Sequence, residues 1–174
     1  MPFESLQKKV LQGSDIGAVL RASAAEICEV FGADRITIYR VIDNGATLSA
    51  LVQTGLESYD PVKVSLHGKR SVAGQVGALK KAVNITNAYD DDELAPLELQ
   101  RKMFVAVDER TGYRTTQVLA APIVSTGGRL LGVVELLNRV DNERFPESCT
   151  DELEALCAIL APAFSLLAKQ HSPA

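Results

Sequence analysis

The chain has 174 residues, 47% of them hydrophobic, which fits a single domain with a sizeable core. Its net charge of −4 gives no reason to expect nucleic acid or an anionic membrane as a partner. No apolar run approaches the roughly 18 residues that span a membrane, and the N-terminus lacks the apolar segment of a signal peptide. We therefore expect a cytoplasmic protein.

The first third of the chain predicts a helix and three strands. Residues 14–32 place apolar side chains at helical spacing; Ser14 or Asp15 can cap this helix, and Gly32 can end it in the left-handed conformation. The following segments are rich in β-branched residues, and the Asp-Asn-Gly turn between the first two predicts a hairpin. The three predicted strands cover residues 35–42, 47–54 and 61–66.

A short helix is predicted from Ser71, although Gly74 and Gly77 each lower its intrinsic stability by about 1 kcal/mol relative to alanine. Two glycines in one short helix indicate the close approach of a neighbouring backbone or of a ligand. A strand follows, then a charged segment that Pro96 interrupts, and then a hairpin of two strands. These strands cover residues 82–86, 117–124 and 130–138.

The last helix, residues 147–170, carries two apolar stripes. The first stripe suits a core and comprises Leu153, Leu156, Cys157, Leu160, Phe164 and Leu167. The second comprises Ala155, Ile159, Ala163 and Leu166. Because one sheet face cannot bury both stripes, we expect a homodimer that forms through the terminal helices.

This order of elements, with mostly hairpin-like connections, predicts an α+β fold in which six strands form a mainly antiparallel sheet with helices on its faces. We divide the chain into a helical lead-in at 1–12, one domain at 13–170 and a tail at 171–174. No internal repeat, low-complexity segment or second domain interrupts this organisation.

The sequence offers no catalytic constellation. It has two histidines, His67 and His171, and no nucleophile elbow, phosphate-binding loop or zinc motif. The three cysteines lack metal-ligand spacing, so we interpret them as buried thiols in a reducing compartment, with a redox role as the alternative. The acidic run at 90–93 lacks the spacing of a calcium loop and is interpreted as a solvated loop. We therefore expect neither an enzyme nor a bound metal.

Several segments together resemble a GAF domain over roughly residues 10–170: SVAGQV, VNITNAYDD, VDERTGYRTTQVLAAPI and GVVELLNR. Within this family the chain is most similar to the GAF domains of cyclic-nucleotide phosphodiesterases and adenylyl cyclases, and to those fused to bacterial signalling proteins or secretion ATPases. The resemblance implies that the terminal helices cover one face of the sheet, and that a short helix and a lid cover a ligand pocket on the other.

The resemblance also implies which residues contact a ligand. Val72 and Ala73 lie where backbone N–H groups meet a phosphate, at a helix start whose unpaired donors and positive dipole suit an anion. The positions that hold base and ribose correspond to Phe104, Asp108, Thr111, Thr115 and Glu135, and Thr37 lies beside them on the first predicted strand. We therefore expect a small anionic or nucleotide-like ligand, and a cyclic nucleotide is the cofactor-like molecule that the resemblance suggests.

Two departures from the family pattern affect this site. The family ends its second strand with an aromatic residue and an acid that stack on and read a purine, whereas Gln53 and Thr54 stand at those positions here. The segment 89–104 is also several residues longer, which reshapes the lid.

Two interpretations of the lid stay open. If residues 111–115 formed one helical turn, Thr111 and Thr115 would share a face toward the ligand. Alternatively, Asp108 and Thr111 form a local turn network that braces the lid over a well-packed site.

The stretch from Asn138 to Glu152 resembles the Asn-Lys…Phe…Asp-Glu signature of the family, with Arg139 in place of the lysine and a longer gap before Asp151. The resemblance implies that Arg139 and Asp151 pair to tie the last strand to the last helix, which is a structural role.

We expect a non-catalytic sensory or regulatory domain that signals through its terminal helices to an effector domain in a longer parent protein. Bilin-binding members attach the chromophore through a suitably placed cysteine, and neither Cys28 nor the two C-terminal cysteines has such a position. The free-methionine sulfoxide reductase of the family uses several lid cysteines, and the lid at 87–115 contains none. The rival hypothesis is a dimerisation scaffold whose pocket is vestigial and empty.

Overall fold

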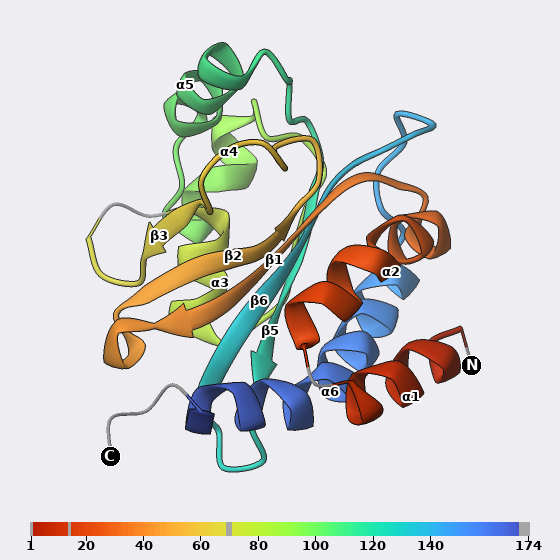
Figure 1. Ribbon diagram of the computed structural model, residues 1–174. Helices are drawn as coiled ribbons and strands as arrows, with labels where there is room; N and C mark the ends of the chain where they lie inside the picture. Colours follow the sequence, from red (N-terminus) through yellow and green to blue (C-terminus); the bar gives the residue numbers. More distant parts are fainter. Residues whose placement is uncertain (1, 14, 69–70, 171–174) are drawn as a thin grey trace.

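The computed structural model describes residues 2–13, 15–68 and 71–170, and its centre is an antiparallel sheet of six strands (Figure 1). Every neighbouring pair in the order β3-β2-β1-β6-β5-β4 is antiparallel, so the sheet is wholly rather than mainly antiparallel. All of the predicted strands are present: β1 (Ala33–Ile42), β2 (Thr47–Gln53), β3 (Lys63–Ser65), β4 (Val83–Ile85), β5 (Val118–Val124) and β6 (Leu130–Arg139).

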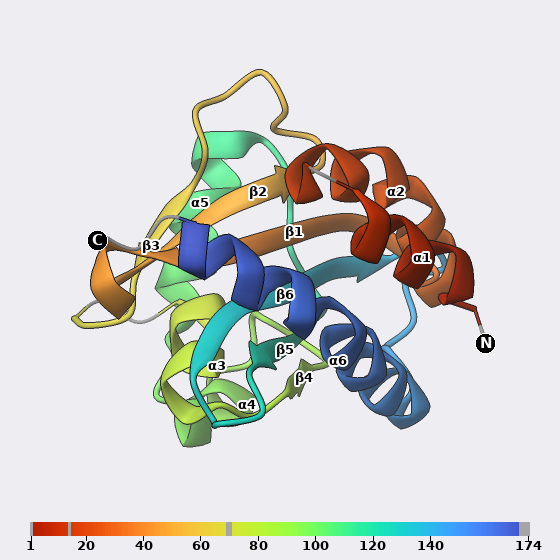
Figure 2. The ribbon, with the colours of Figure 1, turned by 60° about the horizontal axis from the view of Figure 1, so that its bottom comes forward.

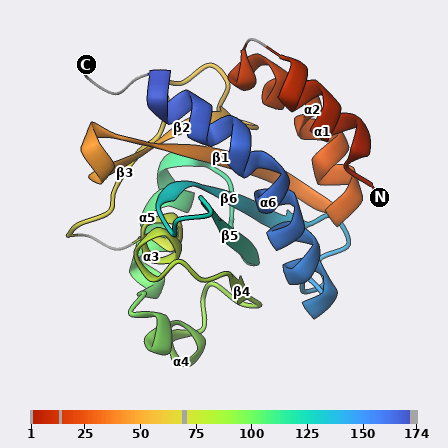
Figure 3. The same cartoon turned by 90° about the horizontal axis from the view of Figure 1, so that it is seen from below.

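The terminal helices α1 (Glu4–Gln12), α2 (Ile16–Phe31) and α6 (Glu147–Gln170) cover one face of the sheet, as Figures 2 and 3 show. Asp15 caps α2, because its Oδ1 accepts a hydrogen bond from the Ala18 N–H at 3.1 Å. Gly32 ends the same helix in the left-handed conformation at φ 64°. Ser14, the other predicted cap, lies outside the described residues.

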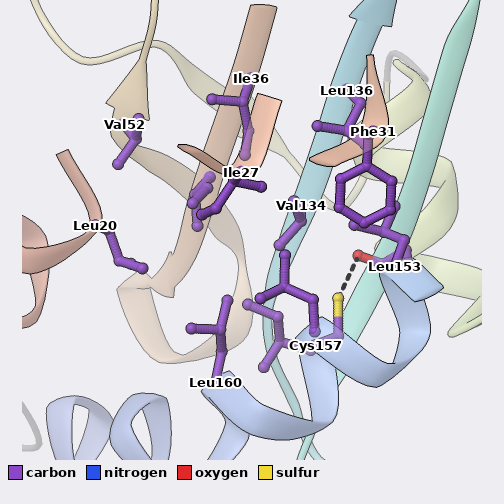
Figure 4. Packing of buried hydrophobic residues seen from close by; sticks show 14 of the residues in the cluster. Leu20, Ile27, Phe31, Ile36, Val52, Val134, Leu136, Leu153, Cys157 and Leu160 are labelled. Atoms are coloured by element: carbon purple, nitrogen blue, oxygen red, sulfur yellow. Dashed lines mark hydrogen bonds between the residues drawn. The ribbon is translucent and has the colours of Figure 1, made fainter. Parts of the chain in front are cut away.

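The core on this face is continuous between the helices and the central strands (Figure 4). Figure 4 shows side chains of α2, β1, β6 and α6 meeting, among them Leu20, Ile27, Ile36, Val134 and Leu153. The three cysteines are free and buried, as interpreted from the sequence. Burial raises the pKa of the Cys28 thiol to about 11, and it also raises the pKa values of the other two, which leaves little reactive thiolate.

Helix α6 buries its first apolar stripe except for Leu167, which is only partly buried. Its second stripe is divided between buried and exposed residues. Ala163 is buried and Ile159 is partly buried, and α1 packs against α6 in this region. Ala155 and Leu166 remain exposed, the latter at 60%. No helix within the described parts of the chain combines the length and apolar character needed to cross a membrane.

The other face carries α3 (Val72–Leu79), α4 (Asp91–Leu94), a 3₁₀ turn (Ala95–Leu97) and α5 (Arg101–Thr111), which pack on a second apolar cluster. The glycines of α3 serve close packing. A Cβ at Gly74 would lie 3.1 Å from the backbone oxygen of Ser65, and one at Gly77 would lie 2.7 Å from Leu66 Cδ2. The glycines therefore let α3 approach β3 and its neighbours, which accounts for them without a ligand.

Candidate functional site

Polar side chains rise from the centre of the sheet on the face that α3 and α5 cover. Thr37 and Tyr39 come from β1, and Glu135, which comes from β6, pairs with Thr37 across the two strands. Alternation along the strands directs all three toward the second apolar cluster, to which Tyr39 and Val133 belong. None of the three side chains forms a hydrogen bond with a described residue. The floor of the site is therefore polar and unpaired.

Glu135 is the ionisable group of this floor. Burial raises the pKa of its carboxyl to about 7, because no cation or donor among the described residues offsets the loss of water. Burial, and then the nearby Glu135 carboxylate, raise the pKa of Tyr39 well above its ordinary value. Near neutral pH the Glu135 carboxyl can therefore either accept a hydrogen bond or donate one.

The start of α3 lies on the same face of the sheet and offers free donors. The Ser71 hydroxyl oxygen accepts a hydrogen bond from the Gly74 N–H at 3.0 Å, and the Gln75 N–H donates to the Ser71 carbonyl at 2.8 Å. The N–H groups of Val72 and Ala73 have no acceptor in the described ranges, and both residues are buried. These two donors lie at the helix start where the resemblance implied that an anion binds.

The lid residues divide into one group that faces the core and one that braces the lid. Phe104 is buried in the second apolar cluster. Asp108 accepts hydrogen bonds from the Tyr89 hydroxyl and, at 3.2 Å, from the Thr115 N–H. Thr111 donates to the Val107 carbonyl at 2.8 Å. Asp108 and Thr111 therefore form the local network that was the alternative interpretation.

The two threonines do not share a helical face. Helix α5 ends at Thr111, and Gly112 turns the chain in the left-handed conformation at φ 72°. Thr115 follows in an irregular segment, where it is 7% exposed and its hydroxyl has no described partner. Of the two hydroxyls, only that of Thr115 is free for a ligand.

Gln53 and Thr54, at the end of β2, use their polar atoms within the protein. Gln53 Nε2 donates to the carbonyls of Leu56, Tyr59 and Asp60, and its Oε1 accepts from the Val62 N–H at 2.9 Å. The Thr54 hydroxyl accepts from the Ile36 N–H at 2.9 Å and donates to the Ile36 carbonyl. These residues hold a loop and extend the pairing of β1 with β2.

Asn138 has a bracing role that the sequence did not predict, since the resemblance placed it in the family signature without naming a contact. Its Oδ1 accepts from the N–H groups of Thr116 at 2.8 Å and Gln117 at 3.0 Å. Its Nδ2 donates to the Tyr113 hydroxyl at 3.0 Å and to the Arg114 carbonyl at 2.8 Å. Asn138 therefore clamps the segment that returns from the lid onto the end of β6.

The predicted pair of Arg139 with Asp151 is not formed. The Arg139 guanidinium contacts Asp141 at 2.5 Å, and Asp151 makes no ion pair within the described ranges. Asp141 stands two positions after Arg139, just before a turn in which Asn142 has a φ of 62°, so it is presented at short range. The long gap before Asp151 leaves that carboxylate on α6, where it lines one surface cleft together with Arg139 and Asp141.

The described residues contain no group of three or more His, Cys, Asp or Glu side chains that could hold a metal ion. His67 is exposed in the loop after β3, and His171 lies outside the described residues. The arrangement of the site suits binding by hydrogen bonds and charge.

Comparison with known proteins gives both a family and relatives. The model of the GAF domain family matches residues 15–164. The Drosophila melanogaster dual 3',5'-cyclic-AMP and -GMP phosphodiesterase 11 is 32% identical over 92 residues, which are 53% of this chain and 6% of that protein.

Two solved structures show the same fold. The GAF domain of a phosphoenolpyruvate-protein phosphotransferase from Coxiella burnetii has a TM-score of 0.75 at 19% identity, covering 97% of this chain and 94% of that one. Free methionine-R-sulfoxide reductase from Neisseria meningitidis has a TM-score of 0.64 at 19% identity, covering 92% and 84%. At these identities the similarity shows a shared fold and does not assign the activity of either protein to this chain.

The chain spans a small fraction of the length of its phosphodiesterase relative, so the activity of that whole protein is not transferred. The family assignment has a firmer basis, because the family model covers most of the chain and the sheet and helices have the arrangement that the resemblance implied. The chain belongs to the GAF domain family, whose members are typically small-molecule-binding regulatory domains.

Proposed function

We propose that this GAF domain is a non-catalytic regulatory module that binds a small anionic or nucleotide-like molecule between the sheet and the elements α3 to α5. The observation that carries the proposal is a set of polar groups on this face without protein partners: the side chains of Thr37, Tyr39, Thr115 and Glu135 and the N–H groups of Val72 and Ala73. The polar atoms of these four side chains are not fully enclosed, so their donors and acceptors, like the two N–H groups, are available to a ligand.

The chemistry of these groups favours a molecule with two kinds of end. The N–H groups at the start of α3 suit a negative end, because the helix dipole adds to their attraction. Glu135 and the hydroxyls suit a ring or sugar that carries both donors and acceptors. Cyclic AMP and cyclic GMP combine these features, and the name of the Drosophila relative makes them the first probes.

We propose that the signal leaves through α6. Asn138 holds the return of the lid to the end of β6, and Gln117 donates to the Asn142 carbonyl at 3.2 Å while accepting from the Arg139 N–H. A lid that closes on a ligand therefore acts on the loop that leads into α6. On this proposal, residues 13–170 form one sensory domain, α1 leads into it, and an effector domain in a longer parent protein receives the signal.

The test compares Thr115→Val with Thr111→Val by calorimetry with cyclic AMP and cyclic GMP. Removing the free Thr115 hydroxyl leaves a ligand group unpaired and should weaken binding about tenfold. Thr111→Val is the matched control, because its hydroxyl bonds to its own helix, and its affinity should stay near wild type. Equal affinities for wild type and Thr115→Val would remove this residue from the site.

A dimerisation scaffold with an empty pocket is the second candidate. It is favoured by the internal bonds of Gln53, Thr54 and Asp108, and by the exposed apolar side chains Leu11 on α1 and Leu166 on α6. A thermal-shift screen that shows no stabilisation by either cyclic nucleotide, or by any other small metabolite tested, would support the scaffold instead.

A further inference from the structure

A second cleft, of about 340 Å³, opens on the α6 side of the sheet where that helix ends. Its walls come from the end of β1, the β1–β2 turn, the start of β6 and the last turns of α6. Figures 2 and 3 show these turns of α6 passing over β1 toward the β1–β2 hairpin. The volume lies within the range of about 300–1,000 Å³ that is usual for small-molecule sites.

Arg40 lines this cleft without a protein partner. Alternation along β1 puts it on the same face as Ile36 and Ile38, beneath α6, where it is partly buried. Its guanidinium has no hydrogen bond or ion pair with any described residue, and no carbonyl of α6 accepts from it. The Arg40 nitrogens are not fully enclosed, so the five N–H donors of its guanidinium are open to a partner from solution.

The remaining walls define the chemistry of that partner. Arg129, in the β5–β6 turn, is a second cation on the cleft, and its side chain is also unpaired within the described ranges. Asp43, the one acidic lining residue that the structure describes, pairs with neither arginine. Leu167 and Ala168 of α6, both partly buried, supply an apolar wall. The cleft therefore joins two positive charges to an apolar surface.

We propose that this cleft binds a small organic anion, with its carboxylate or phosphate between Arg40 and Arg129 and its apolar part against Leu167 and Ala168. The bound anion neutralises two unpaired cations and links both hairpins to the last turns of α6. It thereby fixes the end of the helix from which the signal leaves. The site is separate from the ligand face under α3 and α5 and does not depend on it.

The proposal is tested by following backbone amide shifts of the full chain during titration with butyrate, inorganic phosphate and butylammonium at constant ionic strength. Butyrate should shift the amides of Gly45 and Arg129 in a saturable way at millimolar concentration. Phosphate should bind more weakly, because it cannot use the apolar wall, and butylammonium should give no saturable shift. The variant Arg40→Gln should weaken butyrate binding at least about tenfold.

Three variants complete the test. Arg129→Gln, at an exposed turn position that leaves folding unaffected, should also weaken butyrate binding. Arg110→Gln makes the same charge change on the exposed side of α5 and should bind butyrate like wild type, as should Thr115→Val. The proposal is overturned if wild type gives no saturable butyrate shift, if both Arg40→Gln and Arg129→Gln bind as wild type does, or if Arg110→Gln loses as much affinity as they do. Phosphate binding as tight as butyrate would refute the role of the apolar wall formed by Leu167 and Ala168.

Discussion

At the scale of single residues, Glu135 combines an unusual position with a measurable consequence. Its carboxyl stands in the middle of the sheet with a pKa raised to about 7, against an ordinary value of 4.5. At a pH between these two pKa values, Glu135 keeps its proton in the folded protein but has released it in the unfolded chain. The Glu135 carboxyl therefore contributes most to the free energy of unfolding below pH 4.5, and this contribution is lost as the pH rises through 7.

We predict that Glu135→Gln flattens this pH dependence. The wild type should lose up to about 3 kcal/mol of stability from this group between the two pKa values, and the variant should not. Urea denaturation at a series of pH values measures the difference. Glu109→Gln, which removes an exposed carboxyl on α5, is the control and should follow wild type. A pH profile of Glu135→Gln that parallels wild type would contradict the prediction.

Asn138 shows how one side chain can determine the path of a lid. We predict that Asn138→Ala lowers the free energy of unfolding by about 2–4 kcal/mol, because five hydrogen bonds to the segment at 113–117 are lost and the backbone has a φ of 54°. Asn138→Gly loses the same bonds but tolerates the backbone, so it should be about 1 kcal/mol more stable than the alanine variant. Denaturant titration measures both, and near-wild-type stability of Asn138→Ala would mean that the clamp is dispensable.

At the scale of elements, β6 depends on a glycine where α6 crosses it. A Cβ at Gly132 would lie 2.2 Å from the Tyr39 carbonyl oxygen and 3.1 Å from the Phe164 ring. The first contact is with backbone in the middle of the sheet, which cannot move without breaking the pairing of β1 with β6.

We therefore predict that Gly132→Ala destabilises the fold by more than about 3 kcal/mol, or prevents folding. Gly127→Ala is the matched control in the β5–β6 turn, where a Cβ would meet only Ser125 Oγ at 3.9 Å, and it should change stability by less than about 0.5 kcal/mol. Thermal unfolding followed by circular dichroism distinguishes the two. A well-folded Gly132→Ala protein would show that β1 and β6 can separate locally.

At the scale of the whole molecule, the terminal helices leave apolar side chains exposed next to one another. Leu11 of α1 and Leu166 of α6 are 61% and 60% exposed, and both line one cleft. We predict a homodimer through this surface, and Leu11→Glu with Leu166→Glu should give a monomer. Val140→Glu, at an equally exposed position outside the helices, should leave the dimer intact. Light scattering that shows a monomeric wild type at high concentration would contradict the dimer.

The sequence predicted what depends on local pattern and missed what depends on distant contacts. Alternation and turn residues located every strand, and the caps Asp15 and Gly32 follow from local backbone chemistry. The predicted pairing of Arg139 with Asp151 was wrong, because the turn at Asn142 brings the carboxylate of Asp141 close to the guanidinium instead. The bracing bonds of Gln53 could not be predicted, since they depend on the fold of a loop that carries no periodic signal.

The outermost strands of the sheet, β3 and β4, have three residues each, whereas the central strands β1 and β6 have ten. Beside β4, the Glu93 carboxylate accepts hydrogen bonds from the N–H groups of Thr86 and Asn87, which occupies donors that another chain could use. Short, occupied borders of this kind resist the strand-to-strand joining that leads to fibrils. Copies of this domain that meet in a crowded solution therefore have little backbone through which to aggregate, and association is left to the side chains of the helices.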